Sequence, residues 1–144
     1  MINRVGEFIC LFMILVALTG CSSSKVPFDD RNISFKVIDT QTSENEISKS
    51  IEVTNQTGYD LINLKMELSY YLKNSSSENE DSNFVKGYRI KSGDSQIITV
   101  KVPADNVNKI DLDNPDIDFS GNFIEGIEIV PFGIVANLSV VADL

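Results

Sequence analysis

Histidine is absent from the sequence, and with it the side chain that most often serves as a general base and as a nitrogen ligand for metals. The nucleophile turn Gly-x-Ser-x-Gly is also absent. No pair of carboxylates stands out from the general acidity, although the sequence alone leaves a Ser-Lys dyad open. These absences predict a chain that is not an enzyme and that uses no cofactor.

Positive charge is scarce. Lys and Arg number 12 against 21 Asp and Glu, which gives a net charge of −9. Such a chain is repelled by the phosphates of nucleic acids and by anionic lipid headgroups, so we expect no nucleic-acid partner. Apolar residues make up 42% of the sequence, which is enough for the core of one domain.

Only one long hydrophobic run occurs, FICLFMILVAL at residues 8–18. As a helix it would extend about 17 Å, whereas a membrane-spanning helix needs about twenty residues. Its length matches the hydrophobic core of a secretory signal. The alternatives are an ordinary signal peptide, or an N-terminal membrane anchor followed by an unrelated cysteine.

The end of this run carries a recognisable motif. Leu18-Thr19-Gly20-Cys21, followed by three serines, resembles the lipobox of bacterial lipoproteins. In that family the cysteine receives a diacylglyceryl group and the signal is cut just before it. The resemblance implies a signal peptide at 1–20 and a lipid on Cys21, and two acyl chains hold a protein stably on a membrane. It also implies location at the extracytoplasmic face of a bacterial cell membrane.

Cysteine is otherwise nearly lacking. Cys10 would leave with the signal and Cys21 would carry the lipid, so no cysteine remains for a disulfide. Residues 21–31 are Ser-rich and unpatterned, and we predict that they form a flexible tether. The folded domain is then expected at residues 32–144.

The apolar period in this domain is two, as in half-buried antiparallel strands. Leu64, Met66, Leu68 and Tyr70, for example, alternate with polar residues. Seven strands are predicted, around residues 33–37, 51–53, 64–70, 88–90, 98–102, 127–129 and 136–140. Turns are predicted at residues 55–58, 92–94, 114–115, 120–122 and 131–133. The pattern predicts an all-β, single antiparallel immunoglobulin-like β-sandwich of about seven strands, with a small barrel as the alternative.

Two turn motifs support the sandwich. The segments VTNQTG at residues 53–58 and SGDS at 92–95 resemble the FxLYD type of small immunoglobulin-like domains in bacterial surface lipoproteins. The aromatic-Asp end that the family has on its long strand is replaced here by Tyr70-Tyr71-Leu72-Lys73. The resemblance implies the fold and no particular chemistry. Residues 74–83, NSSSENEDSN, are predicted to form a polar connecting loop.

The segment DLDNPDIDFSGN contains the densest carboxylates, at Asp111, Asp113, Asp116 and Asp118. Oxygen ligands at close spacing can bind Ca²⁺, but Pro115 occupies the fifth position, where an EF-hand loop needs a ligand. In the alternative interpretation, two short extended segments meet at Pro115 and expose the aspartates to water. These four residues are the low-priority candidates for a metal site.

The sequence therefore favours a membrane-anchored, non-catalytic binding or accessory module. Its partners would be the membrane, through the lipid on Cys21, and another envelope protein, through an edge strand or loops. The alternative is a calcium-binding envelope domain that uses the segment 111–118. A third, less favoured hypothesis is an enzyme that acts on a wall polymer.

Overall fold

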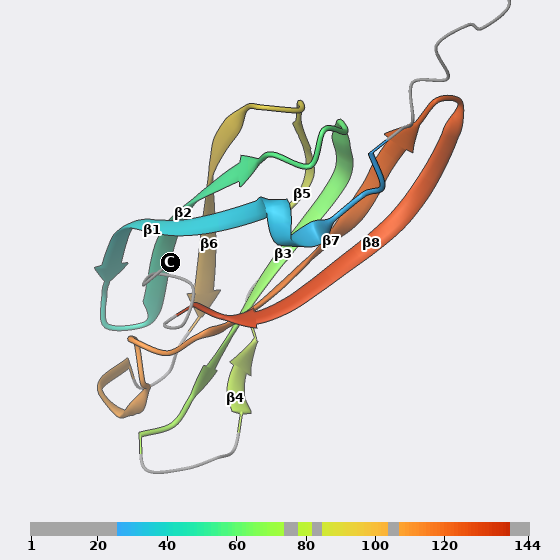
Figure 1. The fold of residues 1–144 in the computed structure, drawn as a ribbon. Coiled ribbons are helices and arrows are strands. Elements are labelled where there is room, and N and C mark those ends of the chain that lie inside the picture. The colour runs from blue at the N-terminus through green and yellow to red at the C-terminus, as the bar shows by residue number, and fades with distance from the viewer. Residues whose placement is uncertain (1–25, 74–77, 82–84, 104–106, 139–144) are drawn as a thin grey trace, which may run out of the picture.

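The computed structural model describes residues 26–73, 78–81, 85–103 and 107–138 (Figure 1). Two 3₁₀ turns, η1 (Asp30–Asn32) and η2 (Val107–Lys109), accompany the strands. The strands are β1 (Ile33–Thr42), β2 (Glu46–Asn55), β3 (Leu61–Tyr71), β4 (Glu78–Asp81), β5 (Val85–Ile90), β6 (Ser95–Pro103), β7 (Asp116–Glu125) and β8 (Glu128–Asn137).

The strands form two antiparallel sheets. One sheet has the order β1-β2-β6. In the other, β3 pairs with β4 and β5 on one side and with β7 on the other, and β8 pairs with β7 at the edge. Among the described strands no ladder joins the two sheets, so the fold is a sandwich rather than a barrel. The first, second and sixth strands lie in one sheet, and the third, fourth, fifth, seventh and eighth lie in the other.

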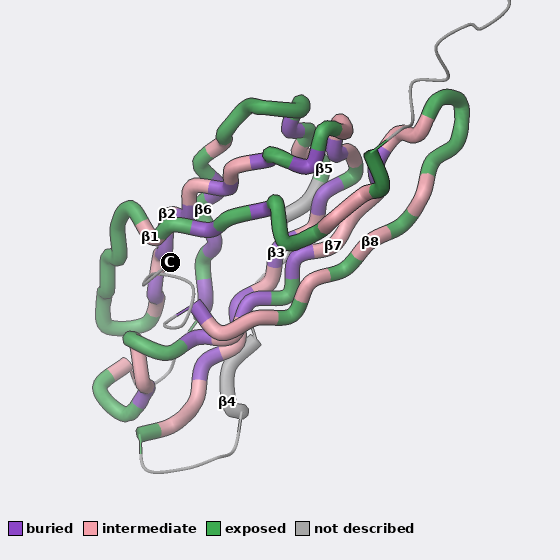
Figure 2. The backbone as a smooth tube through the Cα atoms, in the orientation of Figure 1, coloured by how far each residue is buried: buried purple, intermediate pink, exposed green. Residues whose placement is uncertain are grey.

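The core lies between the sheets and confirms the predicted period of two. In β3, the side chains of Leu64, Met66, Leu68 and Tyr70 are buried, and the residues between them are partly exposed. Figure 2 shows the same alternation of buried and partly exposed positions along β2. Removal of these apolar side chains from water is the main force that holds the sheets together.

Two predicted turns are wrong. Residues 120–122 and 131–133 lie inside β7 and β8 and pair with each other, Ser120 with Gly133 and Asn122 with Pro131. The turn between these strands is instead at Gly126 and Ile127, with Gly126 in the left-handed region at φ 65°. The segment predicted as a strand at 127–129 is therefore the end of this turn and the start of β8. The strand predicted at 136–140 extends beyond the described residues, which end at Leu138.

Gly121 and Pro131, which are typical of turns, occupy positions inside strands for other physical reasons. A Cβ on Gly121 would lie 2.7 Å from Cδ2 of Leu64 and 2.9 Å from the carbonyl oxygen of Ile62, so only glycine fits where β3 passes. The pairing of β3 shifts register there, beside Asn63 at φ 53°. Pro131 is tolerated because β8 is an edge strand, where one row of N–H groups has no partner strand to donate to.

The segment predicted as a loop at 74–83 also differs in part from the prediction. Glu78–Asp81 forms the short strand β4, which pairs with Ser69, Tyr70 and Tyr71 at the end of β3. This brings the described strands to eight rather than seven. The composition of a polar segment does not reveal such pairing, because the neighbouring strand supplies its hydrogen bonds.

The sandwich has two distinct ends. The N-terminal end contains residues 26–33 and the turns β2–β3, β5–β6 and β7–β8; at this end Ile33 pairs with Asn55. The opposite end contains the β1–β2 turn, residues 107–115 and Leu138; here Thr42 pairs with Ile47. Figure 1 shows the described N-terminal segment beside the β7–β8 hairpin.

Candidate functional site

The lipobox residues Leu18, Thr19, Gly20 and Cys21 lie outside the described residues, so lipidation of Cys21 stays a prediction. The described chain begins at Val26, five residues after the cysteine. In the part of the chain that the structure covers, no helix has the length and hydropathy needed to cross a membrane.

Part of the predicted tether packs on the domain. The ring of Phe28 stacks on Phe123 with centroids 4.0 Å apart and an interplanar angle of 1°, and it lies 5.4 Å from the ring of Phe132. The hydroxyl of Tyr59 donates a hydrogen bond to the carbonyl oxygen of Val26. The packed domain therefore includes Phe28 and the backbone of Val26, which the sequence assigns to the tether.

Two of the candidate aspartates accept hydrogen bonds within the fold. Asp111 accepts from the backbone N–H of Asp113 at 3.1 Å and from Nδ2 of Asn114 at 2.9 Å. The bond from Asn114 is the main reason why the pKa of Asp111 is lowered. Asp116 accepts from Nδ2 of Asn137 at 2.8 Å and from the hydroxyl of Tyr71.

The four aspartates do not converge on one point. Asp113 and Asp118 are exposed, and Asp118 projects from β7 while Asp113 lies in the preceding loop. Across the described ranges, no group of three or more acidic side chains is arranged to hold a metal ion. A calcium site at residues 111–118 stays a prediction.

A buried lysine is the least expected polar residue of the sandwich. Lys49 lies on the inward face of β2, between Ile47 and Ile51, and only 5% of its surface is exposed. Its Nζ donates to the carbonyl oxygen of Leu112 at 3.0 Å. Burial lowers the pKa of Lys49, and the nearby carboxylate of Asp113 acts in the opposite direction.

Tyr70 faces this lysine from the other sheet. The Nζ of Lys49 is 5.8 Å from the centroid of the Tyr70 ring, within the range of a cation–π contact. The Tyr70 hydroxyl is buried and has no hydrogen-bond partner among the described residues, and burial raises its pKa. Two polar groups are thus held inside the core at one end of the sandwich, and their burial costs free energy.

Lys49 lines a hollow of about 450 Å³ at the opposite end of the sandwich. The lining residues are Val37, Thr40, Thr42, Lys49, Leu112, Asp113 and Leu138. They offer an ammonium group, a carboxylate and two hydroxyls beside apolar walls, a mixture that suits a side chain or small polar ligand. We define this set as the Lys49 hollow.

Lys49 is absent from the sequence-based candidates, although a signal for it exists. The alternation of Ile47, Ile51 and Val53 places position 49 on the buried face of the strand. A lysine on such a face is unusual, because charged side chains are rarely buried without a partner.

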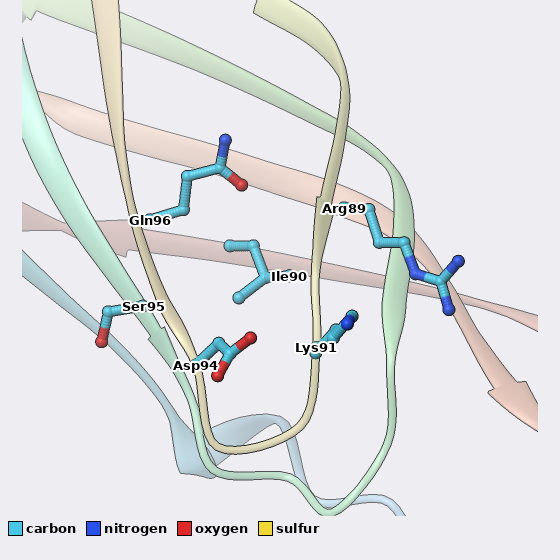
Figure 3. A pocket seen from close by; sticks show the side chains of 6 residues that line it. All are labelled: Arg89, Ile90, Lys91, Asp94, Ser95 and Gln96. Atoms are coloured by element: carbon cyan, nitrogen blue, oxygen red, sulfur yellow. The ribbon is translucent and has the colours of Figure 1, made fainter.

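A second hollow lies between β5 and β6 at the N-terminal end. It measures about 190 Å³ and is lined by Arg89, Ile90, Lys91, Asp94, Ser95 and Gln96 (Figure 3). Figure 3 shows Arg89 pointing away from the gap between the two strands. Its guanidinium group pairs with Asp60 at 2.6 Å, so this cation is already engaged.

Comparisons with known proteins do not identify a family for this chain. No protein-family model and no curated protein matches the sequence. Among solved structures, a FixG-related protein from Vibrio parahaemolyticus is 12% identical, with a TM-score of 0.35, and the match covers 74% of this chain and 94% of that one. A protein from Archaeoglobus fulgidus is 8% identical, with a TM-score of 0.40 and coverage of 73% and 90%.

The sporulation control protein Spo0M from Bacillus subtilis also matches. It is 10% identical, with a TM-score of 0.34, and the match covers 72% of this chain and 48% of that one. Similarities this weak carry no argument about function.

Proposed function

We propose that this chain is an extracytoplasmic lipoprotein, anchored to a bacterial cell membrane through Cys21, whose sandwich is a non-catalytic binding module for another envelope protein. The observation that supports this proposal best is the placement of two features at opposite ends of the domain. The N-terminal segment packs at one end through Phe28, and the Lys49 hollow opens at the other.

The short spacer between Cys21 and Val26 would determine which end of the domain lies near the membrane. Val26 follows Cys21 by five positions, and five extended residues reach at most about 18 Å. A lipid on Cys21 would therefore keep the N-terminal end close to the membrane. The Lys49 hollow would then face away from the membrane, where a partner can approach it.

The chemistry of the hollow favours a protein partner. Its apolar walls, formed by Val37, Leu112 and Leu138, can bury an apolar side chain, and Lys49 and Asp113 can pair with polar groups beside it. The net charge of −9 disfavours nucleic acid. Calcium binding at residues 111–118 stays the alternative.

The anchor is tested by metabolic labelling with a palmitate analogue. We expect Cys21→Ser to abolish labelling and to release or mis-process the protein. Cys10→Ser, which changes the other cysteine of the chain, is expected to leave labelling intact. If Cys21→Ser remains at the membrane with unchanged mass, the lipoprotein assignment is wrong.

The binding surface is tested by in-cell photocrosslinking from Thr42, which lines the hollow, and from Gln56, which is exposed at the N-terminal end. We expect the probe at Thr42 to capture one envelope protein, and Cys21→Ser to abolish the capture. Capture from Gln56 alone would place the binding surface elsewhere.

A further inference from the structure

The turn between β7 and β8 carries apolar side chains where water should favour polar ones. Ile127 is fully exposed in the turn, and Ile129, the second residue of β8, is 61% exposed. Single exposed apolar residues are common on soluble proteins. Here, however, Val26, which is 72% exposed, lies at the same end of the sandwich. We define Ile127 and Ile129 as the hairpin tip.

Aromatic packing fixes the tip relative to the N-terminal segment. Phe28 stacks on Phe123, and Ile127 follows Phe123 by four residues, at most about 14 Å along an extended strand. Cys21 precedes Val26 by five residues, a reach of at most about 18 Å. A membrane that holds a lipid on Cys21 therefore lies within reach of the tip.

The charges near the tip favour a zwitterionic lipid surface over a second copy of the chain. Glu125 and Glu128 flank the turn, and Glu128 is exposed. A second copy docked tip to tip would bring four carboxylates together, which like-charge repulsion opposes. A zwitterionic lipid surface accepts apolar side chains below its headgroups and leaves the carboxylates beside its ammonium groups. Anionic lipids should weaken this contact.

We propose that the hairpin tip is a second membrane contact, with Ile127 and Ile129 inserted at the headgroup boundary of a zwitterionic membrane next to the lipid anchor. This inference rests on the proposed anchoring through Cys21. It fixes the orientation of the domain, so that the long axis of β8 points away from the membrane and the Lys49 hollow is held at the far end.

The absence of tryptophan from the chain allows a direct test. Ile127→Trp places a single fluorophore at the tip, and Val135→Trp places one on β8 at another outward-facing, 78% exposed position. The two sites are eight residues apart, which separates them by about 25 Å along the hairpin. Each variant of the full lipidated protein is reconstituted into phosphatidylcholine vesicles, with and without brominated lipid.

We expect the protein to float with the vesicles. The indole introduced by Ile127→Trp, the tip fluorophore, should emit at shorter wavelength and be quenched by brominated lipid. The indole introduced by Val135→Trp, the control fluorophore, should keep the emission of a water-exposed ring and should not be quenched. Replacing part of the phosphatidylcholine by an anionic lipid should reduce the quenching of the tip fluorophore while flotation persists.

Other outcomes separate the two proposals. Flotation with the tip fluorophore unquenched overturns the membrane-contact proposal and leaves the anchor intact. Quenching of both fluorophores means that the domain lies flat, which also overturns insertion by the tip alone. A blue shift without quenching assigns the tip to a protein contact. Failure of the lipid-processed protein to float refutes the anchor, and the contact that depends on it.

Discussion

The ammonium group of Lys49 lies 5.8 Å from the centre of the Tyr70 ring, although the two residues belong to different sheets. The contact joins β2 and β3 across the core at the end that holds the Lys49 hollow. Both polar groups have lost water there, and the ammonium receives only partial compensation from the Leu112 carbonyl and the ring face. Burial of these two polar groups should therefore cost stability, and the contact between them offsets only part of that cost.

Lys49→Met tests this cost. Burial lowers the pKa of Lys49 from 10.5, so the unfolded chain holds the proton more tightly than the folded one. The cost is fully present below the lowered pKa and disappears as pH rises to about 10.5. We expect the variant to be as stable as the wild type at neutral pH, or more stable by about 1 kcal/mol, with a difference that narrows in alkali. Urea denaturation at a series of pH values measures this difference in the free energy of unfolding. A difference that does not depend on pH would contradict burial of the charged ammonium group as its cause.

Asn55→Ala should destabilise the fold strongly. The Asn55 side chain is fully buried, and its Nδ2 donates to the carbonyl oxygens of Tyr59 at 2.7 Å and Ile90 at 3.1 Å. Its Oδ1 accepts from the backbone N–H and the hydroxyl of Thr57. Removing the amide leaves several of these groups unpaired, at a cost on the order of 3 kcal/mol in the free energy of unfolding.

The neighbouring residue supplies the control for this variant. Gln56 is exposed in the same turn, and Gln56→Ala should change the free energy of unfolding by less than about 0.5 kcal/mol. Equal losses in the two variants, measured by urea denaturation, would show that the turn rather than the buried amide matters.

Gly121→Ala and Gly133→Ala form a matched pair on adjacent strands. A Cβ at position 121 would meet Leu64 and Ile62 at less than 3.0 Å, whereas at position 133 it would meet only Cβ of Ser120, at 3.9 Å. We expect Gly121→Ala to lose about 2 kcal/mol through overpacking and Gly133→Ala to be nearly neutral. Thermal melts of the two variants give the comparison, and similar melting temperatures would contradict the close approach of β3.

Asp60→Asn tests how the free energy of unfolding changes at acid pH. The hydrogen bond from Arg89, and then that from the Ser92 N–H, lowers the pKa of Asp60 below 3.8. A lowered carboxylate pKa stabilises the fold above pH 3.8, and this contribution is lost as pH falls through the lowered pKa. The pair is near the surface, so the loss in the variant should be less than about 1 kcal/mol.

The same pH series should be run on Asp94→Asn, which changes an exposed carboxylate of the adjacent turn. Asp60→Asn should differ from the wild type at neutral pH and converge with it in acid, while Asp94→Asn should not follow that course. A difference that persists unchanged in acid would exclude the ion pair as its cause.

Calcium should leave the melting temperature unchanged. Asp111 and Asp116 are held by separate hydrogen bonds, and the described acidic side chains form no group suited to a metal ion. Thermal melts with millimolar calcium and with a chelator test whether calcium changes the melting temperature. A rise in melting temperature that Asp113→Asn abolishes would instead support the calcium alternative.

Much of the fold is readable from the sequence because burial in a sandwich repeats every second residue. The apolar period predicts β1, β2, β3, β5 and β6, and Asn55 and Gly93 mark real turns. The prediction fails at Gly121 and Pro131, because these residue types are normally signals of turns. Their actual reasons, a bulge in β3 and a free sheet edge, depend on strands distant in sequence.

The candidate site is less predictable than the fold. Carboxylate density draws attention to Asp111 and Asp113, but density alone does not determine whether side chains converge. Lys49 is identifiable as a lysine on an apolar face, whereas its contacts with Leu112 and Tyr70 depend on how the second sheet and a loop are placed. The prediction that Cys21 is lipidated rests on the lipobox motif alone.

In the lipid-anchored protein that we propose, the stacking of Phe28 on Phe123 would also limit how widely the domain can search for a partner. With a lipid on Cys21, a free tether to Asn32 would reach about 40 Å, whereas the spacer to Val26 reaches about 18 Å. The accessible volume scales with the cube of that length, so the packed phenylalanine reduces it roughly tenfold. The local concentration of the domain toward partners held in the same membrane rises by the same factor, without any added contact.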